Sequence, residues 1–257
     1  MSKKICLIGA GNVGHHLGMR LFKKGHDVVQ VFSRRLEKAA SLASEIKATA
    51  INDLGLLVSD ADFYIIAVHD DAIQEVSNQI NQENGIVVHT SGSINTSVLS
   101  KHAFYGSFYP LQTFTINKLP DWKTIPFCFC GNDISTEKKI KKLVQSISKN
   151  EHLISDEERL SLHLPAVIVN NFTNHLIGIA KDICEEKSVP FELLVPLLRE
   201  SLKKAENHDP FEIQTGPAKR DDQKTIKKHL SLLKNEQYRS VYQLLSESIL
   251  KTNVDKK

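Results

Sequence analysis

The sequence lacks a long hydrophobic run. Its first apolar stretch, residues 5–8, stops at Gly9, whereas the apolar core of an export signal spans roughly 7–15 residues. A membrane-spanning helix needs about 20 apolar residues, and no run approaches that length. We therefore expect no export signal and no membrane partner, and we predict a cytoplasmic protein.

A strong charge of one sign is also missing. The chain has 33 Lys and Arg against 30 Asp and Glu, which leaves a net charge of +3. The densest basic run, STEKKIKKLVQ at 135–145, is typical of the solvated face of a helix. Nucleic acid is therefore not an expected partner.

Metal-ligand spacing is absent among the four cysteines and eleven histidines. The sequence contains no C-x-x-C pair and no H-E-x-x-H motif, which are the common signatures of zinc sites. His15 and His16 are adjacent, so on a helix they would point about 100° apart, which is poor for chelation. We expect no metal site, and we expect the cysteines to be reduced thiols.

The sequence does contain a glycine-rich motif near its start. Residues 9–14 read GAGNVG and match G-x-G-x-x-G, after which Val13, Leu17 and Leu21 follow at helical spacing. Such glycines can be simple turn residues. Between a strand and a helix, however, they allow a tight turn, a close approach of a pyrophosphate and close helix packing, and the helix start binds the anion. We predict cofactor contacts from Gly9, Ala10, Gly11, Asn12, Val13 and Gly14.

Short β-branched runs alternate with amphipathic segments in the first part of the chain, which is typical of a mostly parallel sheet with crossover helices. We predict strands at 4–8, 28–32, 63–68, 86–89, 105–108, 127–130 and 152–154, and helices at 12–24, 36–46, 71–82 and 135–149. From Ser155 onward the pattern is helical, and Ser155 with Glu158 matches a capping box. These patterns predict an α/β Rossmann domain, residues 1–154, and an all-α domain, residues 155–257.

The end of the second strand predicts the cofactor. NAD-binding domains place an acidic residue there for the ribose 2′-hydroxyl, whereas NADP-binding domains use arginine for the 2′-phosphate. This strand ends in FSRR, without an acid, and guanidinium groups bind phosphate well. We predict NADP(H), held by Ser33, Arg34 and Arg35; the alternative is two exposed arginines paired with Glu37.

Two later strand ends are candidates for the rest of the cofactor site. The segments IIAVHDDAI at 65–73 and VVHTSGSI at 87–94 place small and polar residues after predicted strands, where ligands of open α/β sheets bind. Residues 91–93 could instead form a simple turn. The predicted lining residues are Ala67, Val68, His69, His89, Thr90, Ser91 and Gly92.

An apolar segment at 159–180, RLSLHLPAVIVNNFTNHLIGIA, carries polar residues inside a predicted helix. At 100° per residue, Asn170 and Asn174 share the face of His163, whereas Asn171 lies about 80° away, although Pro165 disturbs the helix. The polar residues either hydrogen-bond within a helical interface, or one of the pair His163 and Asn171 faces the nicotinamide and handles a substrate carbonyl or hydroxyl. We predict that His163 and Asn171 are the catalytic residues.

Six segments together resemble one family: GAGNVG, AVHDDAI, VVHTSG, FYPLQTF at 108–114, HLPAVIVNNFTNHL at 163–176 and TGPAKRDDQKTIKKHL at 215–230. The chain is similar over nearly its whole length to Rossmann-like NADP oxidoreductases with a helical DUF2520 domain. More distantly it resembles 6-phosphogluconate dehydrogenase, pyrroline-5-carboxylate reductase and F420-dependent NADP reductase. The helical domain is accordingly expected to be of the 6-phosphogluconate dehydrogenase C-terminal type.

The resemblance implies hydride transfer between NADP(H) and an unidentified small molecule bound between the domains. It makes His163 and Asn171 the recurrent polar pair, and it makes Thr215–Pro217, Thr225 and His229 part of a loop and helix start that face the cleft. The chain has Tyr109 where the family commonly has histidine, and Arg220-Asp221-Asp222 where it has R-G-D. The predicted substrate contacts are Tyr109, Gln112, Arg220 and Asp222.

Two further expectations concern assembly and class. The helix over 166–183 is apolar on several faces and must be buried, so we expect a homodimer formed through the C-terminal domain, as the resemblance also implies. The alternative to an enzyme is a non-catalytic NADP(H)-binding sensor, which would have no need of His163. From the residues alone, Asp222 could also cap the helix that follows it.

Overall fold

The structure is a computed structural model, and it describes residues 2–82 and 84–254. The chain forms two compact units, Met1–Asn170 and Asn171–Lys257. The first unit contains the sheet, and the second is helical over its described residues. The functional boundary predicted at residue 154 follows the last strand and stays a prediction.

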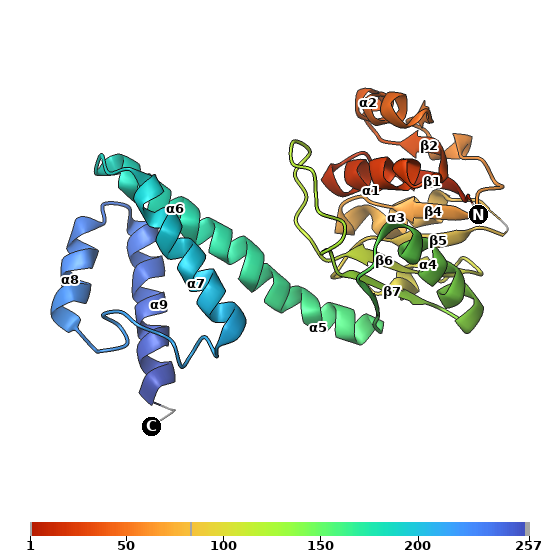
Figure 1. Ribbon diagram of the computed structural model, residues 1–257. Helices are drawn as coiled ribbons and strands as arrows, with labels where there is room; N and C mark the ends of the chain where they lie inside the picture. The colour runs from red at the N-terminus through yellow and green to blue at the C-terminus, as the bar shows by residue number, and fades with distance from the viewer. Residues whose placement is uncertain (1, 83, 255–257) are drawn as a thin grey trace. The chain divides into compact units, whose positions relative to one another are not determined.

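The first unit is built on an eight-stranded sheet with the order β3-β2-β1-β4-β5-β6-β7-β8 (Figure 1). Every neighbouring pair is parallel except β6 and β7, which are antiparallel. The predicted Rossmann-like, mostly parallel sheet is therefore confirmed. The strands are β1 (Lys4–Ile8), β2 (Asp27–Phe32), β3 (Thr49–Ile51), β4 (Phe63–Ile66), β5 (Ile86–His89), β6 (Tyr105–Pro110), β7 (Phe127–Gly131) and β8 (Glu151–Leu153).

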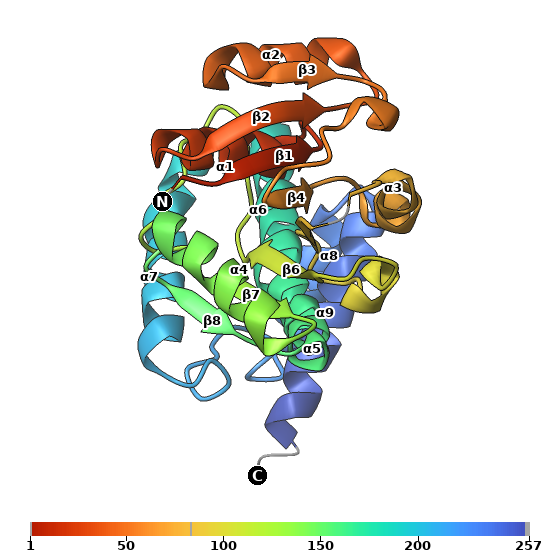
Figure 2. The ribbon, with the colours of Figure 1, turned by 90° about the vertical axis from the view of Figure 1, so that its right-hand side faces the viewer.

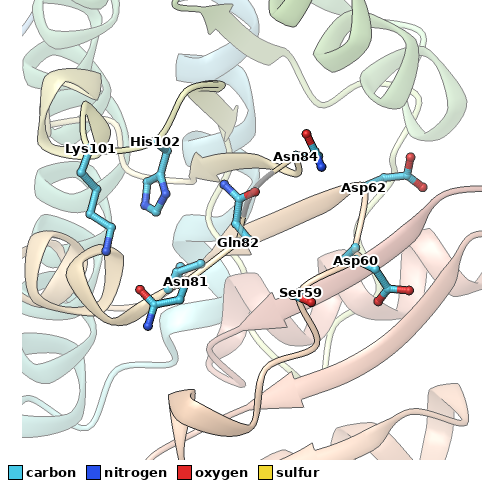
Figure 3. Close-up of a pocket in the computed structure, with 10 residues that line it drawn as sticks. Ser59, Asp60, Asp62, Asn81, Gln82, Asn84, Lys101 and His102 are labelled. Carbon is cyan, nitrogen blue, oxygen red and sulfur yellow. The ribbon is translucent and has the colours of Figure 1, made fainter.

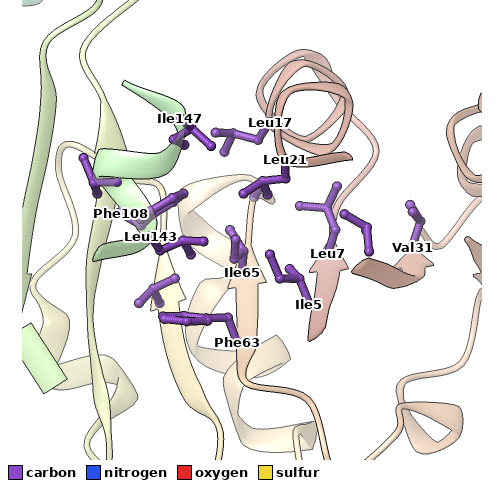
Figure 4. Packing of buried hydrophobic residues seen from close by; sticks show 14 of the residues in the cluster. Ile5, Leu7, Leu17, Leu21, Val31, Phe63, Ile65, Phe108, Leu143 and Ile147 are labelled. Carbon is purple, nitrogen blue, oxygen red and sulfur yellow. The ribbon is translucent and has the colours of Figure 1, made fainter. Parts of the chain in front are cut away.

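Helices cover both faces of this sheet. The helices α1 (Asn12–Lys23), α2 (Leu36–Ile46) and α4 (Ile134–Ile147) contribute to one apolar cluster, and α3 (Ile73–Gln79) contributes to the other. Figure 4 shows Leu17 of α1 beside Ile147 of α4, above the strand residues. In Figure 2, α4 lies over β6 and β7, which it contacts. Burial of these side chains is the main driving force for the unit's folding.

The structure differs from the prediction at one strand and one helix. The strand β3 was not predicted, and the helix predicted at 71–82 begins as a 3₁₀ turn, Asp70–Ala72, and ends at Gln79. Ile80 is extended and buried, so the helix stops where the chain turns to bury this side chain.

The helix α5 (Asp156–Val167) begins at a capping box, as predicted. The Ser155 hydroxyl accepts from the Glu158 N–H at 3.2 Å, and the Glu158 carboxylate accepts from the Ser155 N–H at 2.7 Å. Three residues after Pro165 the helix changes to a π-helical turn, Ile168–Phe172. The 100° step of an ideal helical wheel therefore does not hold for the asparagines that follow His163.

The second unit consists, over its described residues, of α6 (Thr173–Glu186), a 3₁₀ turn (Phe191–Leu194), α7 (Val195–Asn207), α8 (Gln223–Leu232) and α9 (Glu236–Val254). The Asp222 carboxylate accepts from the Thr225 N–H at 3.0 Å and so caps α8, as the sequence predicted. Over 2–82 and 84–254, no helix is long and apolar enough to cross a bilayer.

Candidate cofactor and active site

The glycine turn between β1 and α1 has the geometry of a pyrophosphate site. Gly9 has φ +121°, and a Cβ there would lie 2.1 Å from the Ala67 carbonyl oxygen. A Cβ on Gly14 would lie 1.9 Å from the Gly9 carbonyl oxygen, whereas a Cβ on Gly11 would meet nothing within 4 Å. Gly11 is also the N-cap of α1, so the first N–H groups of the helix have no side-chain cap and can bind an anion.

The end of β2 presents two arginines to solvent. The Ser33 N–H donates to the Ile51 carbonyl oxygen at 3.1 Å, and the Ser33 hydroxyl accepts from the Arg35 N–H at 3.3 Å. Arg34 and Arg35 are exposed. Within the described part of the chain neither pairs with a carboxylate, so the alternative pairing with Glu37 is not formed. Both guanidinium groups are accessible to a phosphate.

Hydrogen bonds join the carboxyl ends of β1, β4 and β5 in a row. The Ala67 N–H donates to the Ile8 carbonyl oxygen at 2.7 Å, and the Thr90 N–H donates to the Ile66 carbonyl oxygen at 3.0 Å. The hydroxyl of Ser93 donates to the Asp70 carboxylate, which links the two loops that follow β4 and β5. The glycine turn and the loop after β5 therefore lie on one continuous edge of the sheet. His69 lies two residues after Ala67, in the loop that follows β4, and is exposed.

His89, at the end of β5, is fully buried. Its Nδ1 accepts from the Ser91 N–H at 3.2 Å, so in the neutral ring the proton lies on Nε2. Nε2 is buried without a hydrogen-bond partner among the described residues. Burial, and secondarily the charge of Arg159, lowers the pKa of His89 to about 4, so the ring is neutral near pH 7.

His163 and Tyr109 approach each other beside Gly92. A Cβ on Gly92 would lie 2.6 Å from His163 Nδ1 and 2.9 Å from the Tyr109 hydroxyl oxygen, so only glycine leaves room for both. His163 Nδ1 is buried and has no hydrogen-bond partner in the described part of the chain. Burial raises the pKa of Tyr109, which keeps its phenol protonated at neutral pH.

Arg159 and Asp156 belong to this region and were missed from the sequence. The Arg159 side chain is 0% exposed and donates to the carbonyl oxygens of Ser91 at 2.7 Å and Ile94 at 2.5 Å, and to Asp156 at 2.5 Å. The second Asp156 oxygen accepts from the N–H and the hydroxyl of Thr96 at 2.8 and 2.6 Å. The only sequence signal was the i, i+3 spacing of two charges, which is equally typical of a surface helix.

The remaining predicted site residues lie in loops and at helix ends. Gln112 is exposed in the loop after β6. Asn171 lies in the π-turn, Asp222 caps α8, and Arg220 is exposed just before it. Asn171, Arg220 and Asp222 belong to the second unit, and their participation in the site stays a prediction.

A cavity of about 880 Å³ lies elsewhere on the first unit (Figure 3). Its lining residues precede β4, β5 and β6, and so lie at the amino ends of these parallel strands. They include Ser59, Asp60, Asn81, Gln82, Lys101 and His102. This edge is opposite to the glycine turn, so the cavity is not part of the predicted cofactor site.

Comparison with known proteins gives the family. Residues 4–92 match a family described as NADP oxidoreductase, coenzyme F420-dependent, and residues 125–249 match a domain of unknown function, DUF2520. A solved structure assigned as an NADP oxidoreductase from Bacteroides fragilis is 35% identical, with 97% of this chain and 98% of that chain covered and a TM-score of 0.91. The chain belongs to this family of NADP oxidoreductases. The predicted DUF2520 family and the predicted cofactor, NADP(H), are thereby confirmed.

More distant relatives share the fold. A protein from Thermotoga maritima is 23% identical over 98% of this chain and 99% of its own, with a TM-score of 0.70. A 1-pyrroline-5-carboxylate reductase from Streptococcus pyogenes is 14% identical over 98% of this chain and 99% of its own, with a TM-score of 0.64. A search of curated proteins gave no match.

Proposed function

We propose that this oxidoreductase transfers hydride between NADP(H) and a small molecule with a C=O or C=N group. When bound, the nicotinamide supplies the hydride chemistry; the chain's own residues bind, orient and handle the proton. The continuous edge from the glycine turn to Gly92 supports this proposal, because ligands of open α/β sheets bind along that edge.

The proposed cofactor contacts follow that edge. The N–H groups at the start of α1 bind the pyrophosphate, and Ser33, Arg34 and Arg35 bind the 2′-phosphate. The nicotinamide half contacts Ala67, Val68 and His69 after β4, and Thr90, Ser91 and Gly92 after β5. His89 is fully buried at the end of β5 and supports this strand end by packing.

His163 is the proposed proton-handling residue. The observation that carries this role is its buried Nδ1, which lies beside Gly92 and the Tyr109 phenol and has no partner among the described residues. In the reducing direction, carbon receives the hydride, and oxygen or nitrogen receives a proton from the site. Asn171 is proposed to orient the substrate, with Tyr109, Gln112, Arg220 and Asp222 as further contacts.

The test combines a substrate screen with one substitution. Small oxo acids, aldehydes and imines are screened for NADPH oxidation by loss of nicotinamide absorbance. His163→Ala should bind NADPH normally and lose about 10²–10⁴-fold in turnover, which is the typical contribution of a positioned acid or base. His152→Ala is the matched control, because His152 is an exposed histidine on β8.

Two outcomes would contradict the proposal. Full turnover of His163→Ala would make this histidine structural. NADPH binding without oxidation by any compound of the screen would favour the sensor, in which the same fold reports cofactor level to a partner.

The proposed organisation is cofactor binding by residues 1–154 and substrate binding and dimerisation by residues 155–257. We further propose the cytoplasm as location. Burial raises the pKa of the Cys6 and Cys128 thiols to about 12 and about 11, so both are packing residues that stay reduced in such a compartment.

A further inference from the structure

The helix α5 contacts the sheet through charged residues. Asp156, Arg159 and His163 are spaced i, i+3 and i+7, which places them on one face of the helix. Arg159 is the largest of the fully buried side chains. A buried guanidinium costs several kcal/mol of desolvation unless its hydrogen bonds are satisfied, so its partners determine what it does.

The strand residues near Arg159 are polar as well. His89 is paired with Ser107 on β6, and Tyr109 is paired with Cys128 on β7, so these side chains alternate onto the same face of the sheet. Burial lowers the pKa of His89 and raises the pKa of Tyr109 and Cys128, and the positive charge of Arg159 lowers the pKa of all three. The end of β5 is therefore surrounded by polar groups rather than by an apolar core.

Arg159 and Asp156 fix the loop that follows β5. Arg159 binds the carbonyl oxygens of Ser91 and Ile94, and Asp156 binds the N–H and hydroxyl of Thr96. The segment between these anchors includes Gly92. The first turn of α5 thus holds both ends of a short loop through directional bonds.

His163 follows Arg159 by one helical turn. Its Nδ1 and the Tyr109 hydroxyl meet at Gly92, inside the segment that Arg159 holds. An apolar pair in place of Asp156 and Arg159 could stabilise the fold equally well. An apolar pair could not bind the two loop carbonyl oxygens, and so could not fix Gly92 relative to His163.

We propose that Arg159 is a positioning residue, which sets the place of the His163 imidazole relative to Gly92 and Tyr109 by holding residues 91–94 against α5. The proposal rests on the proposed function, in which His163 handles the proton. Arg159 itself is fully buried and acts through the loop and the helix.

The experiment compares Arg159→Met, Arg159→Lys and the double variant Asp156→Leu/Arg159→Met in the full-length protein. Stability is measured by urea unfolding, cofactor binding by NADPH titration, and turnover as separate kcat and KM values. The position of His163 is followed by NMR of ¹³C-labelled histidine rings, with His163→Gln to assign the signal. Arg20→Met is the control, since Arg20 also binds a backbone carbonyl oxygen, that of Ile147, at 2.7 and 2.9 Å.

In Arg159→Met the His163 signal should shift, and kcat should fall about 10²-fold with a smaller change in KM, as expected for a misplacement of about 1 Å. NADPH affinity should fall by a much smaller factor than kcat, because the glycine turn and the arginines after β2 are untouched and only the nicotinamide half contacts residues 91 and 92. The double variant should regain stability without regaining kcat. Arg159→Lys keeps the charge and one donor group, so it provides a folded variant if the methionine variant does not fold.

Two results would overturn the proposal: an unchanged His163 signal in the folded Arg159 variants, or a double variant that regains kcat together with stability. In either case Arg159 would only stabilise the fold. The ring signal needs no substrate, so it tests Arg159 even if the screen finds no turnover and the proposed function fails. Arg20→Met should leave both the His163 signal and kcat unchanged, and a change there would make the effect of Arg159 non-specific.

Discussion

At the scale of single residues, two histidines near the end of β5 show how surroundings decide a role. His89 is fully buried, and its Nδ1 is occupied by the Ser91 N–H. Its lowered pKa keeps it neutral throughout the physiological range. His163 is only partly buried, and its Nδ1 faces Gly92. We therefore propose that proton exchange with a substrate is a role of His163, whereas the buried His89 is a packing residue at the strand end.

The buried His89 predicts a pH dependence of stability. Its folded-state pKa of about 4 lies below the ordinary value of 6.5, so between these values the unfolded chain binds a proton that the folded chain does not. The stability contributed above about pH 6.5 is then lost as the pH falls towards 4. From pH 7.5 to pH 5, His89 should account for a loss of about 2 kcal/mol in the free energy of unfolding.

Urea unfolding of the parent chain and of His89→Gln at both pH values checks this expectation. The glutamine variant should lose less stability on acidification by about that amount. His152→Gln, at an exposed histidine, serves as the control. Identical pH dependence of the parent and His89→Gln would show that His89 is not responsible.

Arg34 and Arg35 predict the choice of cofactor. Both are exposed at the end of β2, and neither pairs with a carboxylate within residues 2–82 and 84–254. NADPH should bind at least tenfold more tightly than NADH, a difference of about 1.4 kcal/mol or more. Arg34→Ala should reduce this ratio through weaker NADPH binding, with NADH binding unchanged. Calorimetry that finds equal affinities in the parent chain would refute the assignment.

At the scale of elements, local signals were sufficient for prediction. The glycine turn, the capping box at Ser155 and the Asp222 cap of α8 each depend on residues within one or two turns of each other. Backbone N–H groups at a helix start need partners whatever the rest of the fold does. Such local features can therefore be predicted from a single sequence.

Other elements depend on distant parts of the chain and could not be predicted from local sequence signals. The three residues of β3 form a strand only because Gln30 to Phe32 of β2 pair with them. Arg159 is buried because the carbonyl oxygens of Ser91 and Ile94, 68 and 65 residues away, accept its hydrogen bonds. The π-turn after Pro165 likewise could not be predicted from a helical wheel, which assumes a fixed rotation per residue. The glycine turn and the choice of NADP(H) were therefore predictable, whereas the surroundings of His163 were not.

At the scale of the whole molecule, the helical unit buries few apolar side chains by itself. Of its described side chains, residues 171–252, the buried hydrophobic ones are Ala218 and Ile226. Leu193, Leu197 and Leu244 are 70%, 64% and 68% exposed. Large apolar side chains exposed on several helices in this way are typical of an interface, and burial of apolar area is what drives stable association.

We therefore predict a symmetric homodimer formed through the helices of residues 155–257, with a mass in light scattering of twice the 28.9 kDa of one chain. A second copy would bury the exposed apolar side chains of both subunits, since a two-fold interface uses the same surface on each. Leu197→Glu combined with Leu244→Glu should shift the protein to monomers at micromolar concentration, because burying these charges in an apolar interface is costly. Leu119→Glu is the control, since Leu119 is 91% exposed in the first unit and its replacement should leave the dimer intact. A parent chain that scatters as a monomer at the same concentration would contradict the prediction, and the apolar helices would then need a different partner.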